Sequence, residues 1–263
     1  MSTDDVRTHG STGPPVLLLP GGAESCEGFF PGLPEGLVTD PGCRVVVHDR
    51  PGTGTSTKTG SLAGAAAHLG ALIDEIDSGP VVLVGQSLGG AVAVLLAAEH
   101  PEKVAGLVLL DPTPINDTRV CARLERTMRV VGALASIPGP GTALSAATRA
   151  ATKRAARRAR LRPDCEAALV RTGDVDLRRL AEAVRGITAL SEGLQGKDLP
   201  QVPAVVVTAD RAPDSAVRGA HTRLAAALGA PVVCWPGATH SVHLDHPDET
   251  LAAVRDVVAR ART

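Results

Sequence analysis

The chain has 263 residues, of which 44% are hydrophobic and 21% charged, and its formal net charge is −1. This length and composition predict one compact domain and argue against disorder, while the balanced charge gives no general attraction to nucleic acid or to an anionic membrane. No apolar run reaches the roughly 18 residues of a membrane span. The five cysteines are scattered without a CxxC spacing, and the N-terminus lacks an apolar signal segment. We therefore expect a reducing, cytoplasmic setting.

Strands alternate with helices along most of the chain, which predicts an α/β fold with a parallel sheet. Residues 1–13 are polar, and we expect them to be flexible. Short β-branched runs that end in turn residues predict buried strands at 16–19, 44–47, 81–84, 104–110, 204–207 and 231–235. Apolar residues at helical spacing predict helices at 62–76, at 88–99 and from about residue 248 onward.

The interval 112–200 breaks this alternation, because it contains no strand-like run and is rich in Ala and Arg. The Pro- and Gly-rich segment 137–141 divides it into helical pieces. An insertion at this point of such a sheet lies over the carboxyl ends of the strands, where ligands bind. We therefore expect a core formed by 14–111 and 201–263, covered by a helical lid formed by 112–200.

The most informative segment is 81–90, in which a β-branched strand ends in Gly-x-Ser-x-Gly and an Ala-rich helix follows at once. A sharp turn between strand and helix strains the central residue and pushes its side chain out of the fold. Gly85 and Gly89 flank that turn, where a Cβ would collide with the neighbouring strand or helix. The pattern predicts that Ser87 is an exposed nucleophile.

Three further segments accompany this turn at matching spacing: 17–22, 48–56 and 237–247. Together the four segments resemble the α/β-hydrolase family, in its single-domain, lid-bearing form. The resemblance implies a mostly parallel, doubly wound sheet with the helical lid inserted after the sixth strand. It also implies acyl transfer through a Ser-His-Asp triad, with no cofactor.

The resemblance assigns the general acid and base to His240, which follows the last strand and precedes the C-terminal helix; we expect His243 to be structural. Family members commonly place the acid after the strand at 204–207, and that slot holds Ala212 between Asp210 and Asp214. Some relatives, including certain dehalogenases and polyketide-releasing thioesterases, place it after the strand that follows the nucleophile helix. That position is Asp111, which we favour, with Asp210 and then Asp214 as alternatives.

The resemblance also implies an oxyanion hole made by the backbone N–H groups of Leu88 and Gly22. The family often has His-Gly-x before the second donor, whereas this chain has Pro20 in place of the histidine. We expect Gln86, Gly21 and Ala23 to contribute to substrate binding.

Two other segments have competing interpretations. The segment 49–54 lacks the Lys and Ser/Thr of a phosphate-binding loop, so we interpret it as a structural turn. A basic stretch at 149–162 is either a solvated helix face or a docking patch for an acidic partner such as an acyl carrier protein. Its basic residues are Arg149, Lys153, Arg154, Arg157, Arg158, Arg160 and Arg162. The histidine spacing gives no support for a metal site.

The leading hypothesis is a serine hydrolase that cleaves a carboxylic thioester or ester through an acyl-enzyme, and that releases a carrier-bound acyl or polyketide chain. A general carboxylesterase or lactonase is the first alternative. A second alternative is a non-hydrolytic cyclase or binding protein of the same fold. In each case the expected partner is a small molecule, with no nucleic acid and no membrane.

Overall fold

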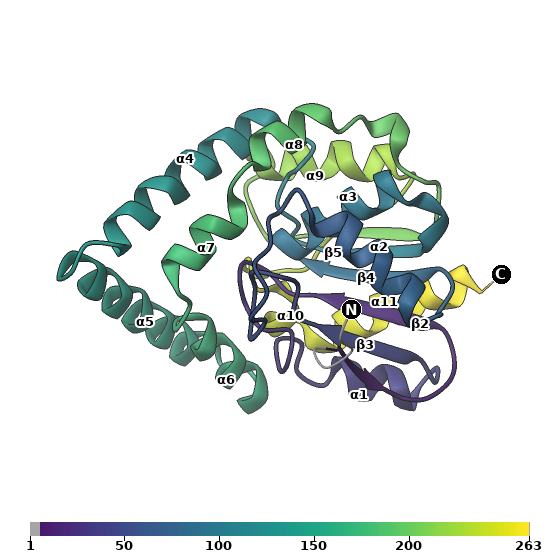
Figure 1. Ribbon diagram of the computed structural model, residues 1–263. Coiled ribbons are helices and arrows are strands. Elements are labelled where there is room, and N and C mark those ends of the chain that lie inside the picture. Colours follow the sequence, from purple (N-terminus) through teal and green to yellow (C-terminus); the bar gives the residue numbers. More distant parts are fainter. Residues whose placement is uncertain (1–5, 263) are drawn as a thin grey trace.

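A computed structural model of the chain describes residues 6–262 and contains one seven-stranded sheet (Figure 1). The strand order is β1-β3-β2-β4-β5-β6-β7; β1 runs antiparallel to β3, and every other neighbouring pair is parallel. The strands are β1 (Val6–His9), β2 (Pro15–Leu19), β3 (Arg44–His48), β4 (Val81–Gln86), β5 (Val104–Leu110), β6 (Ala204–Thr208) and β7 (Val232–Cys234). The predicted parallel α/β fold is therefore confirmed.

Helices cover both faces of the sheet, so its central strands are buried on both sides. One apolar core packs α2 (Ala65–Glu75), α3 (Leu88–Glu99) and α9 (Ala216–Ala227) against the sheet. The other packs α1 (Leu33–Thr39) and α11 (Pro247–Ala261) against the opposite face. Two short 3-10 helices, η2 (Pro101–Lys103) and η3 (Gly196–Asp198), precede β5 and β6.

Five helices stand between β5 and β6, where the helical insertion was expected. They are α4 (Thr118–Ala135), α5 (Pro140–Ala159), α6 (Pro163–Thr172), α7 (Leu177–Val184) and α8 (Ile187–Gly193). In Figure 1, α4 and α5 extend away from the sheet as two arms, and α7 lies between them and the core. Within the described residues no single helix is long and apolar enough to cross a membrane; α4 and α5 meet those criteria only when joined, and a 117° bend separates them.

Three sequence-based expectations need correction. Residues 6–9 of the segment expected to be flexible form strand β1, because their backbone pairs with the free edge of β3; residues 1–5 lie outside the described part. The insertion follows the fifth strand of the chain rather than the sixth, because one strand alone precedes β2 in the described residues. The basic helix ends at Ala159, so Arg160 and Arg162 do not continue its basic face.

Candidate active site

Ser87 lies in a strained turn between β4 and α3, with φ 50° and ψ −117°. A positive φ is uncommon for a residue other than glycine, and the surrounding structure must hold the backbone in this conformation. The Ser87 N–H donates to the Leu110 carbonyl at 3.1 Å, and the Ser87 carbonyl accepts from the Thr113 N–H at 2.8 Å. Gly89 permits the close approach of the helix, because a Cβ there would stand 2.1 Å from the Leu19 carbonyl oxygen. These contacts fix the direction of the Ser87 hydroxyl.

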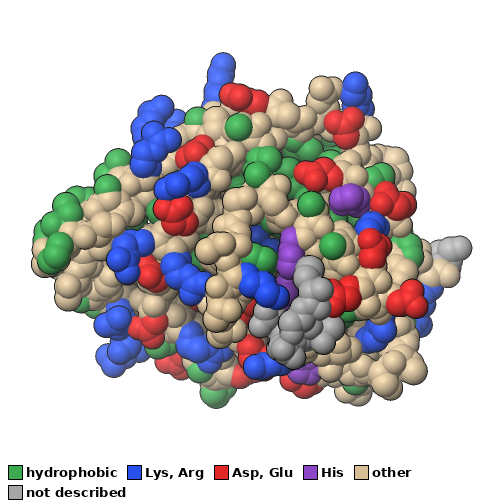
Figure 2. Space-filling model, in the orientation of Figure 1, with side chains coloured by type: hydrophobic (Ala, Val, Ile, Leu, Met, Phe, Trp, Pro, Cys, Tyr) green, Lys and Arg blue, Asp and Glu red, His purple; other side chains and the backbone are tan. Residues whose placement is uncertain are grey.

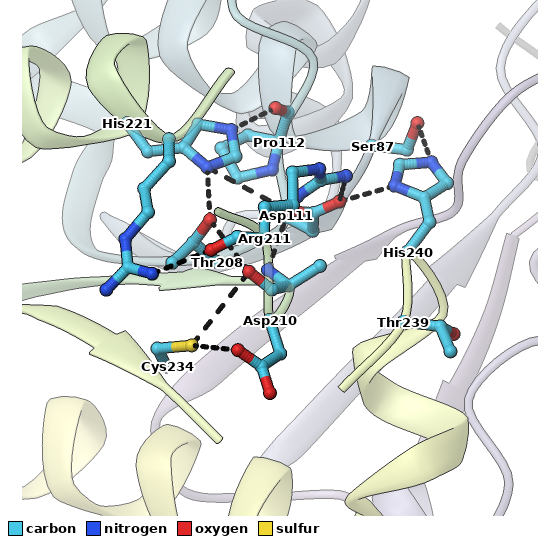
Figure 3. A network of polar contacts seen from close by, with 12 residues as sticks. Ser87, Asp111, Pro112, Thr208, Asp210, Arg211, His221, Cys234, Thr239 and His240 are labelled. Carbon is cyan, nitrogen blue, oxygen red and sulfur yellow. Dashed lines mark hydrogen bonds and ion pairs between the residues drawn. The ribbon is translucent and has the colours of Figure 1, made fainter. Parts of the chain in front are cut away.

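His240 lies on the loop between β7 and α10 (Val242–Asp245), with its ring against Ser87. The Nε2 atom of His240 is 2.9 Å from the Ser87 hydroxyl, and its Nδ1 atom is 2.5 Å from an Asp111 carboxylate oxygen (Figure 3). A carboxylate only accepts, so Nδ1 carries the proton and Nε2 is free to accept from the serine hydroxyl. The buried Gln86 side chain supports the loop by donating to the His240 carbonyl at 2.8 Å.

Asp111 follows β5 directly, as Ser87 follows β4, and it also has a positive φ of 44°. Its side chain is 1% exposed. One carboxylate oxygen accepts from the Ala209 N–H at 2.9 Å, and both oxygens accept from the guanidinium of Arg211. Burial raises the pKa of Asp111, but the hydrogen bonds from His240, Arg211 and Ala209 outweigh burial and hold that pKa far below its ordinary range. Asp111 is therefore an anion at neutral pH.

Sequence reasoning missed Arg211, which stands on the loop after β6. It forms a two-point ion pair with Asp111, and its side chain is 27% exposed. Arg218 anchors this loop by donating to the Arg211 carbonyl at 2.8 Å. In the sequence, one feature alone could have drawn attention to Arg211: it follows Asp210, in the region where the family commonly places the acid of its triad. The partner that gives Arg211 its role is 100 residues away in the chain.

The two alternative acids lie elsewhere. Asp210 is exposed, and its carboxylate accepts from the Gly237 N–H at 2.9 Å, which holds the turn that leads toward His240. Asp214 is exposed, and within residues 6–262 it has no hydrogen bond to His240. Geometry therefore brings Asp111 alone, of the three candidates, to the histidine.

Two further histidines border the site and are neutral. His221 is fully buried: its Nε2 donates to the Pro112 carbonyl at 2.7 Å, and its Nδ1 accepts from the Thr208 hydroxyl at 2.9 Å. Burial lowers the pKa of His221. His243 stacks on Phe29 with ring centroids 4.7 Å apart, and burial lowers its pKa to about 3. His243 thus packs beneath the loop, in agreement with the structural role expected for it.

The loop after β2 passes beside Ser87. A Cβ on Gly21 would stand 2.1 Å from the Gln86 side-chain oxygen and 3.1 Å from the Ser87 Cβ, so a larger residue would have to displace the Gln86 side chain. Gly22 follows with φ 56° and faces Leu180 of α7. Leu88 is the first residue of α3, so its N–H has no acceptor within the helix and is available to a ligand.

Ala23 does not fit the expected substrate-binding role. It is buried and does not line the cavity that opens onto Ser87, and its carbonyl accepts from the Gly54 N–H at 2.9 Å. This contact joins the loop after β2 to the segment 49–54. Asp49 strengthens the connection by accepting from the N–H of Cys26 at 2.6 Å and from that of Thr55 at 2.7 Å. The segment 49–54 thus supports the loop beside Ser87, as its structural interpretation predicted.

A cavity of about 430 Å³ opens onto Ser87 and His240. Helices of the insertion form one wall, through Val120, Leu124 and Met128 of α4 and Leu180 and Val184 of α7. This wall is apolar and suits an apolar group of moderate size. Glu24 also lines the cavity, and burial raises its pKa to about 7, although Arg171 opposes that shift.

Comparisons with known proteins agree with this architecture. The alpha/beta hydrolase family matches residues 16–254. Lipase LipV of Mycobacterium tuberculosis is 49% identical over 70 residues, a segment that covers 27% of this chain and 24% of the lipase. A thermophilic esterase from Thermogutta terrifontis superposes with a TM-score of 0.74 at 22% identity, covering 98% of this chain and 93% of the esterase. MenH from S. aureus superposes with a TM-score of 0.79 at 14% identity, covering 99% and 100% of the two chains.

Proposed function

This chain belongs to the alpha/beta hydrolase family, and from that premise we propose that it is a serine hydrolase of carboxylic esters or thioesters. The observation that carries the proposal is the continuous hydrogen-bonded series from Ser87 through His240 to Asp111. The apolar cavity beside Ser87 supports an acyl substrate of moderate size.

In the proposed reaction, the Ser87 Oγ attacks the acyl carbon while His240 Nε2 takes the hydroxyl proton. The backbone N–H groups of Gly22 and Leu88 stabilise the negative charge that develops on the carbonyl oxygen. Asp111 stabilises the histidinium, and His240 then gives its proton to the departing alcohol or thiol. Water, deprotonated by His240, attacks the acyl-Ser87 ester; the carboxylic acid leaves and the serine regains its proton.

The wall formed by α4 and α7 supports the further proposal that the insertion acts as a lid. Leu180 lies against Gly22, so a shift of α7 would alter both the cavity and one oxyanion donor. Substrate-dependent closure of such an element excludes water from the reaction.

The finer proposal is that the substrate is a thioester on a carrier protein. Its support is the exposed basic face of α5, where Lys153, Arg154, Arg157 and Arg158 are accessible to an acidic partner. Figure 2 shows Lys and Arg side chains distributed over the insertion. Arg149 and Arg162 do not belong to this face, because Arg149 binds Asp174 at 2.6 Å and Arg162 binds Asp248 at 3.0 Å.

Matched substrates test the general proposal of an ester or thioester hydrolase separately from the finer proposal of a carrier-bound thioester. We would measure kcat/KM on oxygen esters and on N-acetylcysteamine thioesters that share one acyl chain, beside Ser87→Ala. A thioester preference that disappears in Ser87→Ala supports chain release, whereas equal or ester-favoured rates support a general carboxylesterase or lactonase. For a carrier-bound thioester, K153E together with R157E should lower kcat/KM while leaving the rate on the free thioester unchanged.

A non-hydrolytic cyclase or binding protein of this fold is the remaining alternative. It predicts no hydrolysis of any ester or thioester, even with a folded chain and an accessible Ser87.

A further inference from the structure

A second cavity, of about 830 Å³, lies between the loop 50–61 and helix α7. Helix α7 separates this second cavity from the cavity beside Ser87. Leu180 and Val184 line the cavity beside Ser87, and Arg178 and Arg179 line the second cavity. Arg179 joins the two sides of the second cavity by donating to the Gly54 carbonyl at 2.9 Å. The proposed hydrolytic chemistry uses no residue of this cavity.

Arg50, a buried arginine whose guanidinium has no hydrogen-bonded acid among residues 6–262, lines this cavity. Arg50 is 3% exposed, and within residues 6–262 its Nε and Nη2 atoms have no hydrogen-bond partner. Burial lowers the pKa of Arg50 to about 10, so the group is still charged at neutral pH. The neighbouring Asp49 does not compensate for it by hydrogen bonding, because its oxygens accept from Ser25, Cys26 and Thr55. A buried charge without hydrogen-bonded compensation is costly, and an anion bound in the adjoining cavity would offset part of that cost electrostatically.

The other charges around the cavity are also predominantly positive. Lys58, Arg178 and Arg179 line it together with Arg50. Two carboxylates line it as well, and each is paired: Asp176 accepts from the Arg178 backbone N–H at 2.9 Å and lies 3.6 Å from the Arg178 Nε atom, and Glu182 binds Arg185 at 2.6 Å. Lys58 has a further interaction and is left out of the balance; Arg50 and Arg179 then remain without a paired carboxylate in the described part of the chain, an excess of two positive charges.

We propose that this second cavity is a binding site for a phosphate-bearing ligand, with its anionic group held between the 50–61 loop and α7. The excess of two positive charges matches a phosphate monoester or diphosphate group. The hydroxyl groups of Thr57, Thr59 and Ser61 line the same space and can donate to phosphate oxygens. Arg178 and Arg179 supply charged donors, which bind phosphate more strongly than neutral ones. The site is distinct from a phosphate-binding loop, because side chains and not a helix N-terminus supply its charge.

Calorimetric titration of the full chain with inorganic pyrophosphate, and separately with ADP, tests the site directly. We expect one saturable site, with a melting temperature that rises with ligand concentration. Saturation by both probes assigns the site to the phosphate groups themselves, whereas tighter binding of ADP indicates that the cavity also holds an organic body. Citrate controls for charge alone and should bind at least about tenfold more weakly.

Variants locate the site. Arg178→Glu should weaken pyrophosphate binding by at least about tenfold, whereas Arg126→Glu, the same reversal on the exposed face of α4, should have little effect. Arg50→Met should abolish the ligand-induced rise in melting temperature, and without ligand it should melt no lower than the parent chain, because it removes a poorly compensated buried charge. Ser87→Ala should bind pyrophosphate normally, so the result is independent of the proposed hydrolase activity.

Two results would overturn the proposal. One is the absence of saturable pyrophosphate and ADP binding to the folded chain. The other is equal binding by the Arg178→Glu and Arg126→Glu variants, which would place any phosphate elsewhere. Arg178 is 62% exposed, so its substitution should not disturb folding, and this comparison can be interpreted even if Arg50→Met fails to fold.

Discussion

Substitution of Asp111 and, separately, of Asp210 tests which of the two aspartates is the acid of the triad. In Asp111→Asn, His240 loses the carboxylate that lies 2.5 Å from its Nδ1 and that would stabilise its charged form. Loss of this charge in a serine triad typically lowers kcat by about 10⁴, or about 5.5 kcal/mol in the barrier. The effect should reach that size here, because the neutral amide would also leave the Arg211 cation uncompensated beside the histidine.

The matched variant is Asp210→Asn. Asp210 contacts the Gly237 N–H and not His240, and the amide oxygen of an asparagine can still accept that bond. We therefore expect kcat/KM on an activated ester to change by no more than about threefold. Both rates would be measured beside circular dichroism spectra, so that loss of the fold is not mistaken for loss of activity.

A third variant distinguishes two causes of the rate lost in Asp111→Asn: the missing carboxylate itself and the Arg211 cation left without its partner. Asp111→Asn combined with Arg211→Met removes both members of the ion pair and should recover part of the rate lost in Asp111→Asn. The reasoning is refuted if Asp210→Asn suffers the large loss while Asp111→Asn stays within about tenfold of the parent rate.

Three further predictions concern stability and pH. Arg211→Met should lower the free energy of unfolding in urea by about 2–3 kcal/mol, less than for a fully buried pair. Because the pKa of Asp111 is low in the folded state, this loss should be present at neutral pH and should shrink as pH falls through the acid range. As a control, Arg223→Met removes the exposed pair Arg223–Asp117 and should lower the free energy of unfolding by under about 1 kcal/mol. Gly89→Ala should cost about 3 kcal/mol in the same assay, since its Cβ would overlap the Leu19 carbonyl, and an unchanged midpoint would contradict the packing argument. Glu24→Gln should raise the melting temperature at pH 8 relative to the parent chain and have little effect at pH 4. The reason is that a carboxyl whose pKa is raised to about 7 in the folded state destabilises the fold as pH increases. Equal shifts of the melting temperature at pH 4 and pH 8 would argue against that pKa.

The sequence was most informative where one short segment determines its own geometry. The β-branched run before Gly85 and the helix after Ser87 predict the turn locally, and β4, α3 and the strained φ of Ser87 follow that prediction. Positions at strand ends were also predictable, because β4 and β5 are parallel neighbours and their carboxyl ends must meet. Asp111 is favoured because the resemblance implies an acid at this strand end, and that position does not depend on how the loops fold.

Features created by contacts between distant segments were not predictable. Strand β1 is short and partly polar, and it exists because its backbone pairs with an edge of the sheet. Arg211 acquires its partner only when the loop after β6 folds against the end of β5. The basic stretch of the insertion ends early because Arg160 adopts a left-handed conformation, which no periodicity of charge reveals.

Reaction of the chain with a fluorophosphonate, followed by peptide mass spectrometry, tests the central claim most directly. The account predicts one covalent adduct on Ser87, absent in Ser87→Ala and formed far more slowly in Asp111→Asn, because nucleophilic attack depends on the proton transfer to His240. A folded parent chain that forms no adduct, or that is labelled equally well in Ser87→Ala, would contradict the assignment of Ser87 as the nucleophile.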